Sequence, residues 1–548
     1  MKSTRFVLGL ALMTTLSFTA ASAFSAEEST WIDSKDKSLV EFWNTLDLKE
    51  AEVTEAQYQA FKNQPDSKLN RKIADASLGL ANRVSTRMKE IKTRLESVDT
   101  AEELDAFIAD LDAHYAENKD FPDVQLLTLE LAQLRPLRGI VYRLAPLAMK
   151  AKVTHSMLLT RFMKLATRIG MYSPTRQTKT VFAYLTEPYT GVVPFTKAVD
   201  FQHYVGKEIY AATWNANLRL GKLNLSSPIV IDNSIFYTID GTKGFKDELA
   251  QYNLFQEGER QLLMAIKDRA MKNQQAFTAF YIDDFMALSS EIGKLYGIEQ
   301  VRDDIEGVPT MAVATKIRQS KYKNMFKFYR NVGPEAMKRA FFHTKMMVEH
   351  MGMAQKALKG DGPKIDTSQL INPAVANSFS ETYEKVLPKW EQMVKGRTTL
   401  VSNRTGETVV VDIPAYYQTY INSGKLDPKT SNPMFDLRRW MPKHFVQTSK
   451  YPPCSVKNEV NLWAVVQGHF AGGTHTVPGL VQKMTGPKGD VPICFRDYFY
   501  GSPDGWEAGA YNVLFPGVAA DKVGTAQRIL KQSDGGRLVA NLLDWVID

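Results

Sequence analysis

The sequence predicts a mainly α-helical protein, with multi-helix N-terminal and central regions and a smaller mixed α+β unit at its C-terminal end. Apolar residues recur at helical spacing through most of the first 395 residues. From about residue 397, β-branched runs and frequent Gly and Pro replace that pattern. The composition, 44% hydrophobic and 11% aromatic, can fill packed cores, so it excludes wholesale disorder.

Residues 1–23 have the three parts of an export signal. Lys2 and Arg5 precede a short apolar run that ends near Leu16, and Ala21 and Ala23 form a small-residue cleavage site. The run is too short for a permanent membrane-spanning helix, although an uncleaved anchor is the alternative. We expect a mature chain that begins near Phe24, is periplasmic or secreted, and has no transmembrane segment after signal removal.

The first domain, residues 24–172, is predicted to be a helical bundle. Thr100 and Glu103 have capping-box spacing, and Leu104, Phe107 and Leu111 follow at helical intervals. Similar patterns cover three further stretches, residues 77–97, 122–134 and 147–171. Helices joined by short loops are typical of a bundle.

The second domain, residues 173–396, is predicted to be mainly helical and begins at the Pro174 break. Pro334 suits the first turn of a helix, and residues 229–238 are strand-like. The predicted helices cover residues 196–221, 245–296, 312–330, 334–358 and 374–395.

The third domain, residues 397–548, is predicted to be a mixed α+β unit with a disulfide. Runs at 398–401 and 408–413 flank a turn that contains Asn403 and Gly406, which indicates a hairpin. Cys454 and Cys494 are the two cysteines of the chain, and an exported compartment favours a bridge between them. A loop of about 40 residues would gain roughly 3–4 kcal/mol from that bridge. Two unpaired cysteines are the alternative.

Charge is strongly segregated along the chain. Residues 98–130 contain ten acidic residues and one basic residue, whereas residues 131–186 contain ten basic residues and no acidic one. At helical spacing, four of these cations form one stripe: Lys150, Arg161, Lys164 and Arg168. The stripe either faces an anionic partner or is neutralised internally by the acidic helices.

A second basic tract covers residues 307–334, where Lys323 and Lys327 lie among aromatic residues and no acidic residue occurs. Cations beside aromatic faces can bind sugar rings or a membrane surface. The alternative is an amphipathic helix with aromatic core residues and lysines that reach solvent along their aliphatic stems.

The motifs for catalysis or metal binding are weak. His343, Met346, Met347 and His350 share a helix face and could suit Cu(I), but methionines at this spacing favour a core face, so no metal is predicted. Cys454 with His469 or His475 could form a nucleophile and base, in competition with the disulfide. The adjacent acids Asp283-Asp284 and Asp303-Asp304 cannot flank one glycosidic bond, although Asp284 and Glu291 could face the same cleft. Residues 485–489 lack the phosphate-loop pattern, so no cofactor is expected.

These observations predict an exported bacterial cell-envelope protein that acts by binding. The expected partner is an anionic envelope polymer or membrane surface, such as lipid headgroups, surface polysaccharide or peptidoglycan, while nucleic acid is not expected outside the cytoplasm. The expected anion-binding residues are Lys150, Arg161, Lys164, Arg168, Lys323 and Lys327. The alternative is an envelope enzyme acting on peptidoglycan with a cysteine or a carboxylate.

Overall fold

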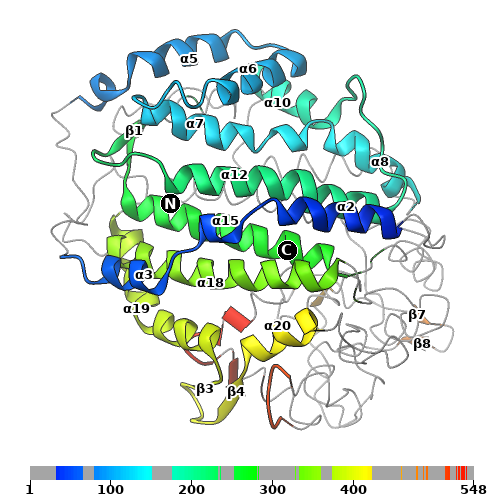
Figure 1. Ribbon diagram of the computed structural model, residues 1–548, viewed down its shortest axis with the longest axis vertical. Helices are drawn as coiled ribbons and strands as arrows, with labels where there is room; N and C mark the ends of the chain where they lie inside the picture. Colours follow the sequence, from blue (N-terminus) through cyan, green and yellow to red (C-terminus); the bar gives the residue numbers. More distant parts are fainter. Residues whose placement is uncertain are drawn as a thin grey trace.

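Helices form most of the described part of the protein in the computed structural model (Figure 1). The structure describes residues 32–65, 79–150, 176–232, 252–280, 332–358 and 373–422, with short pieces between 458 and 490 and between 513 and 539 and the single residues 235, 282 and 328. In this part of the chain the strands form only two-stranded antiparallel pairs, which confirms the predicted mainly α class with a small α+β unit. The predicted export signal lies outside the described residues.

In the N-terminal half, the helices at 101–113, 122–132 and 198–221 lie where helices were predicted, whereas those at 32–44, 55–62 and 176–186 were not predicted. In order, the elements of this half are α2 (Ile32–Asn44), η1 (Leu48–Ala51), α3 (Glu55–Lys62), η3 (Leu80–Arg83), α5 (Thr86–Glu96), α6 (Ala101–Ala113), α7 (Pro122–Ala132), η4 (Arg135–Leu137), α8 (Ile140–Lys150), α10 (Arg176–Thr186), α11 (Ala198–Tyr204), η5 (Val205–Ile209) and α12 (Tyr210–Gly221). The Thr100 capping box is confirmed, because the Thr100 hydroxyl accepts from the Glu103 N–H and the Glu103 carboxylate accepts from the Thr100 N–H.

The remaining elements are longer helices and short strand pairs. They are β1 (Ile229–Asp232), β2 (Tyr252–Phe255), α15 (Glu257–Thr278), α18 (Gly333–Leu358), α19 (Pro373–Lys395), β3 (Thr398–Val401), β4 (Thr408–Val411), α20 (Ile413–Ile421), β5 (Asn458–Glu459), β6 (Val477–Pro478), β7 (Thr485–Gly486) and β8 (Gly489–Asp490). The strand pairs are β1–β2, β3–β4, β5–β6 and β7–β8. The hairpin predicted around Asn403 and Gly406 is confirmed as β3–β4.

Two sequence predictions of helix boundaries were wrong. The helix predicted from residue 77 begins at Thr86 instead, because the Ser85 hydroxyl caps its first turn and Gly79 has a left-handed φ of 57°. The helix predicted from residue 245 begins at Glu257, because Tyr252–Phe255 pairs with β1 and buries Leu254 and Phe255. Tertiary pairing overrides the helical pattern at that point.

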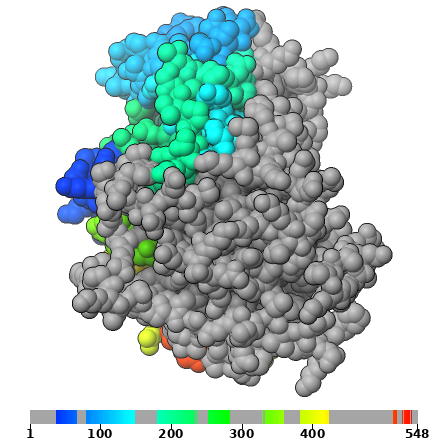
Figure 2. All heavy atoms as spheres, turned by 90° about the vertical axis from the view of Figure 1, so that its right-hand side faces the viewer, coloured from blue at the N-terminus to red at the C-terminus, as the bar shows by residue number. Residues whose placement is uncertain are grey.

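Three helices, α12, α15 and α18, lie side by side in the middle of the molecule (Figure 1). Of the described elements, α15 packs most extensively against α18, which also contacts α19 and α20. Helices α5 and α6 lie at one end of the molecule, where they form the blue surface at the top of Figure 2. One apolar cluster extends from Leu39 to Val539 and includes residues from all three predicted domains. The predicted domain boundaries remain a prediction.

An N-terminal segment, residues 32–62, packs along this helical layer, and we call it the strap. It consists of α2, η1 and α3, which contact η5, α12 and α18 respectively (Figure 1). Helix α11 continues through the π-helical turn η5 into α12, and the Trp43 indole donates to the Gly206 carbonyl of that turn at 2.7 Å. None of the described helices is both long and apolar enough to cross a membrane.

Replacing Gly352 with Ala tests the docking of the strap. A Cβ at Gly352 would overlap the Tyr58 hydroxyl, which is fixed by a 2.6 Å hydrogen bond to Glu391. We expect G352A to lose about 1–3 kcal/mol of unfolding free energy through this overlap, measured by urea denaturation. G396A is the control, because a Cβ at Gly396 meets no atom within 4 Å. Equal stability of the two variants would contradict this packing.

Candidate functional site

The three central helices bring a set of acid–base side chains together in the interior. Asp268 of α15, His343 of α18 and Tyr210 of α12 are each fully buried. The His343 Nδ1 lies 2.8 Å from Asp268 Oδ1, and the His343 Nε2 lies 2.9 Å from the Tyr210 hydroxyl. These contacts define a Tyr–His–Asp triad that crosses all three helices.

A second histidine, His350, lies two turns after His343 on α18 and faces the same carboxyl group. The His350 Nε2 lies 3.6 Å from Asp268 Oδ2, beyond hydrogen-bonding distance. On its other side, His350 Nδ1 lies 2.8 Å from the Gln261 Oε1. Asp268 therefore stands between two imidazoles, bonded to one and facing the other.

The hydrogen bonds around Gln261 fix the tautomer of His350. The Gln261 amide nitrogen donates to Glu257 Oε1 at 2.7 Å, so the Gln261 oxygen must be the atom that faces His350. His350 then donates through its Nδ1–H and leaves Nε2 as an unprotonated acceptor. Neither this Nε2 nor Asp268 Oδ2 has a hydrogen-bond partner within the described part of the chain.

Two bare acceptors that face each other in the interior would be unfavourable, and a proton on Asp268 Oδ2 removes the conflict. In that state Asp268 Oδ1 accepts from His343 Nδ1–H, and the Tyr210 hydroxyl donates to His343 Nε2. All of these groups are then neutral. The donors point in one direction along the chain of contacts, from Tyr210 through His343 and Asp268 toward His350 and Gln261.

Burial favours the neutral form of each of these groups. It raises the pKa of Asp268 well above its ordinary value, against a lowering by hydrogen bonding from Asn217. Burial, assisted by the positive charge of Arg339, lowers the pKa of His343 well below its ordinary value. Burial and then Arg260 lower the pKa of His350 to about 3. The electrostatics therefore favour a carboxylic acid between two neutral imidazoles.

Ion pairs lie at both ends of this chain of contacts. Arg339 pairs with Glu335 on α18 and influences Tyr210 by hydrogen bonding and charge, while burial raises the pKa of that phenol. At the other end Glu257, which accepts from Gln261, pairs with Arg260. The charged residues thus lie beyond Tyr210 and Gln261, and the hydrogen-bonded groups between them are neutral.

The polar residues of this site recur seven residues apart on each helix. Tyr210 and Asn217 do so on α12, Gln261 and Asp268 on α15, and His343 and His350 on α18. Because residues two turns apart share a helix face, this spacing aligns the polar positions across the three helices. The sequence analysis identified His343 and His350 but missed Tyr210, Asn217, Gln261 and Asp268. Polar residues at heptad spacing within apolar helices were the available signal.

A second buried pair connects α15 to α7. The Lys267 Nζ lies 3.0 Å from Glu130 Oε1 and 3.0 Å from Gln133 Oε1, and all three side chains are buried. Burial lowers the pKa of Lys267, and the neighbouring Glu130 opposes that effect. Lys267 directly precedes Asp268 in the sequence, and its pairing with Glu130 fixes another side of α15 against α7.

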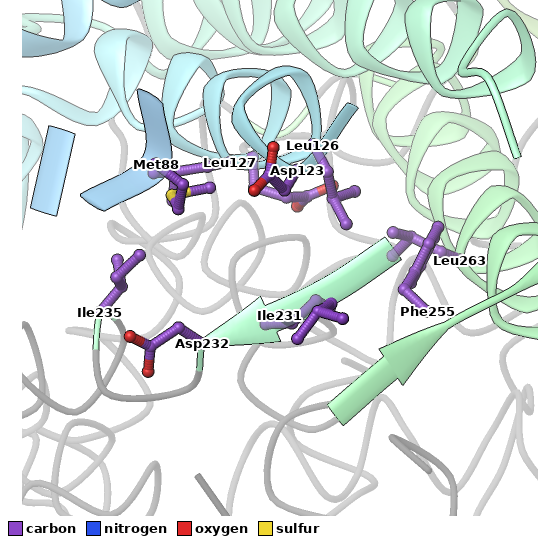
Figure 3. Close-up of a pocket in the computed structure, with 11 residues that line it drawn as sticks. Met88, Asp123, Leu126, Leu127, Ile231, Asp232, Ile235, Phe255 and Leu263 are labelled. Atoms are coloured by element: carbon purple, nitrogen blue, oxygen red, sulfur yellow. The ribbon is translucent and has the colours of Figure 1, made fainter. Parts of the chain in front are cut away.

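A small cavity lies next to this pair, between α7 and the β1–β2 hairpin (Figure 3). Its walls are mainly apolar, and two of its acids are engaged: Asp123 accepts from the Ser85 N–H at 3.0 Å, and Asp232 pairs with Lys92 at 3.0 Å. Its volume of about 30 Å³ can hold a water molecule but not a substrate. We therefore do not regard it as a binding site.

The copper hypothesis for His343, Met346, Met347 and His350 finds no support in the contacts. Both imidazoles are oriented by Asp268, Tyr210 and Gln261, while the Met346 sulfur accepts from the Val53 N–H. Met346 and Met347 belong to the apolar core, as their helical spacing favoured. No group of three His, Cys, Asp or Glu side chains among the described residues is arranged to hold a metal ion.

The other residues singled out from the sequence lie outside the described side chains. Lys150 ends α8, but its side chain is not described, and Arg161, Lys164 and Arg168 follow in residues 151–175. The same holds for the remaining candidates, which are Lys323, Lys327, Cys454, Cys494, His469, His475, Asp283, Asp284, Glu291, Asp303 and Asp304.

Comparison of the chain with protein-family models, with curated proteins and with solved structures finds no match. The residues themselves are therefore the only guide to function. The triad at Asp268 contains the residue types of acid–base catalysis, but a substrate would need a route to it, and its members are sealed. The arrangement can store a proton and fix the alignment of three helices.

Replacing His350 with Gln tests the neutral state of this site. Folded His350 stays neutral down to about pH 3, whereas unfolded histidine takes up a proton below about pH 6.5. His350 therefore contributes stability above pH 6.5 that is lost as the pH falls toward 3. We expect H350Q to make the unfolding free energy fall less steeply on acidification from pH 6 to 4, by roughly 1 kcal/mol per pH unit, in urea titrations.

His114 provides the control, because its imidazole is half exposed and its pKa is raised, chiefly by the hydrogen bond to the Asp110 carbonyl. H114Q should change the slope in the opposite sense and by less. Identical slopes for H350Q and the unsubstituted protein would show that His350 is protonated in the fold and would refute the neutral arrangement.

Proposed function

We propose that the protein binds anionic cell-envelope material through the basic stripe Lys150, Arg161, Lys164 and Arg168. Lys323 and Lys327 are proposed as a second contact. The proposal requires that the stripe is not neutralised by the acidic residues that precede it in the chain. The pairing of those acidic residues is the observation that supports it.

Five of the ten acidic residues of 98–130 are paired with basic residues other than the stripe. Arg138 pairs with Asp105 at 2.6 Å and with Glu102 at 3.0 Å, and Arg94 pairs with Asp110 at 2.6 Å. Further acids are paired as follows: Asp112 with Arg135 and Arg219, and Glu130 with Lys267.

Part of the acidic tract is also committed to backbone groups. The Glu103 carboxylate accepts from the N–H groups of Asp99 and Thr100, and Asp123 accepts from the N–H of Ser85. Internal neutralisation therefore accounts for Arg135 and Arg138, and seven of the ten acids of residues 98–130 have described partners outside the stripe. Cations of the stripe that face solvent would attract an anionic polymer.

Binding is favoured over the alternative, an envelope enzyme acting on peptidoglycan, because the acid–base cluster among the described residues is sealed around Asp268. A cysteine enzyme would need a free thiol at Cys454 or Cys494. Thiol titration of the denatured protein without reductant tests the cysteine enzyme, since the proposed disulfide leaves no titratable thiol. An absence of free thiol would leave only a carboxylate enzyme as the alternative.

Reversing two charges of the stripe tests the proposed function. R161E/R168E should weaken co-sedimentation with anionic vesicles or with cell-wall sacculi at least tenfold, because each reversal replaces attraction with repulsion. The two targets separate a lipid partner from a polysaccharide one. Binding of the unsubstituted protein should also fall as salt rises, since exposed charges are screened over roughly 8–10 Å near physiological ionic strength.

The matched control is K89E/R404E, which changes the net charge equally at two exposed positions on α5 and the β3–β4 turn. It should bind as the unsubstituted protein does. Unchanged binding of R161E/R168E together with a lowered melting temperature would assign the stripe to internal ion pairs and refute the proposal.

A further inference from the structure

Two aromatic anchors hold the strap against the helical layer, and each packs against a glycine. Trp43 lies over Gly206 of η5, and Tyr58 lies over Gly352 of α18. Both rings are buried. Arg339 of α18 donates to the strap carbonyls of Trp43 and Leu46, which fixes the turn between the anchors.

A carboxyl group with one buried oxygen that lacks a described hydrogen-bond partner lies under the second anchor. Glu349 is three residues before Gly352, so it shares the face of α18 that Tyr58 covers. Its Oε2 is buried and has no hydrogen-bond partner within the described part of the chain. A buried oxygen of this kind is far less costly as a protonated acid than as a carboxylate.

The charges that surround Glu349 come from four segments. The strap contributes Glu52 and Glu55, and the Tyr58 phenol lies beside them. Helix α18 contributes Lys345, α19 contributes Lys395, and the buried Asp268 of α15 is also influenced by Glu349. Lys395 already pairs with Glu55 at 2.9 Å, and Glu391 of α19 is engaged by Tyr58 and Lys62.

Docking of the strap and protonation of Glu349 are therefore linked. Burial, with Glu55 and Glu52 adding to it and the two lysines opposing it, raises the pKa of Glu349 to about 7. When the strap leaves, the group regains water and its pKa returns toward its ordinary value near 4.5. The docked state binds the proton more tightly, so its stability relative to the open state falls as the pH rises from about 4.5 through 7.

We propose that the strap, residues 32–62, is a pH-sensitive latch, held closed by the protonated Glu349 side chain and loosened when that side chain ionises against Glu52 and Glu55. Opening removes α3 from α18 and leaves the remainder of the α12–α15–α18 layer folded. The latch is independent of the proposed anion-binding stripe, which lies on other residues.

Hydrogen–deuterium exchange of the full mature chain tests the latch. After correction for the intrinsic pH dependence of exchange, the opening constant of the α3 amides, residues 55–62, should rise about tenfold between pH 6 and pH 8. Amides of α15 should keep their protection over the same range. In E349Q, which cannot ionise, the α3 opening constant should be the same at both pH values.

Glu50→Gln is the control, because Glu50 is an exposed acid on the strap itself, and this variant should keep the tenfold rise. An α3 opening constant that is unchanged by pH in the unsubstituted protein would overturn the latch, even if E349Q failed to fold. A full pH response in E349Q would also overturn it, as would simultaneous loss of protection in α15.

Discussion

The burial of Asp268 between two histidines is the constraint on which the rest of the interior depends. An ionised carboxylate at this depth would cost several kcal/mol of folding free energy without a cationic partner. Its neighbours are imidazoles whose pKa values burial lowers, so they do not supply that cation. The interior therefore favours neutral forms of these groups, and their hydrogen bonds to specific partners set how α12, α15 and α18 align.

The alignment extends outward from this centre. Because α15 and α18 pair Gln261 with His350 and Asp268 with His343, a shift of either helix by one turn would separate both pairs at once. Lys267 and Glu130 attach α7 to the opposite side of α15, and Arg339 attaches the strap to α18. Buried hydrogen bonds between specific partners favour a single arrangement of the helices, whereas apolar contacts alone tolerate sliding. The apolar cluster from Leu39 to Val539 supplies the driving force, and the polar contacts select the arrangement.

Much of the fold was predictable because its signals are local. The capping box at Thr100, the proline that opens α18 and the turn at Gly406 each depend on neighbouring residues only. The strand at Tyr252–Phe255 was not predictable from periodicity, because its partner lies at Ile229–Asp232 and the pairing is a tertiary event. The candidate site was predictable only in part. His343 and His350 share a helix face by spacing, but the sequence does not say which helix faces them, so Asp268 and Tyr210 were missed.

The central claim is that Asp268 is a neutral carboxylic acid inside the folded protein. Infrared spectroscopy at pH 8 tests it most directly, because Glu349, with a pKa near 7, is then mainly ionised. A protonated carboxylic-acid band should be present in the unsubstituted protein and absent from Asp268→Asn, with the helical amide signal unchanged. Loss of an ionised carboxylate band instead, with the carboxylic-acid region identical in the two proteins, would contradict the account.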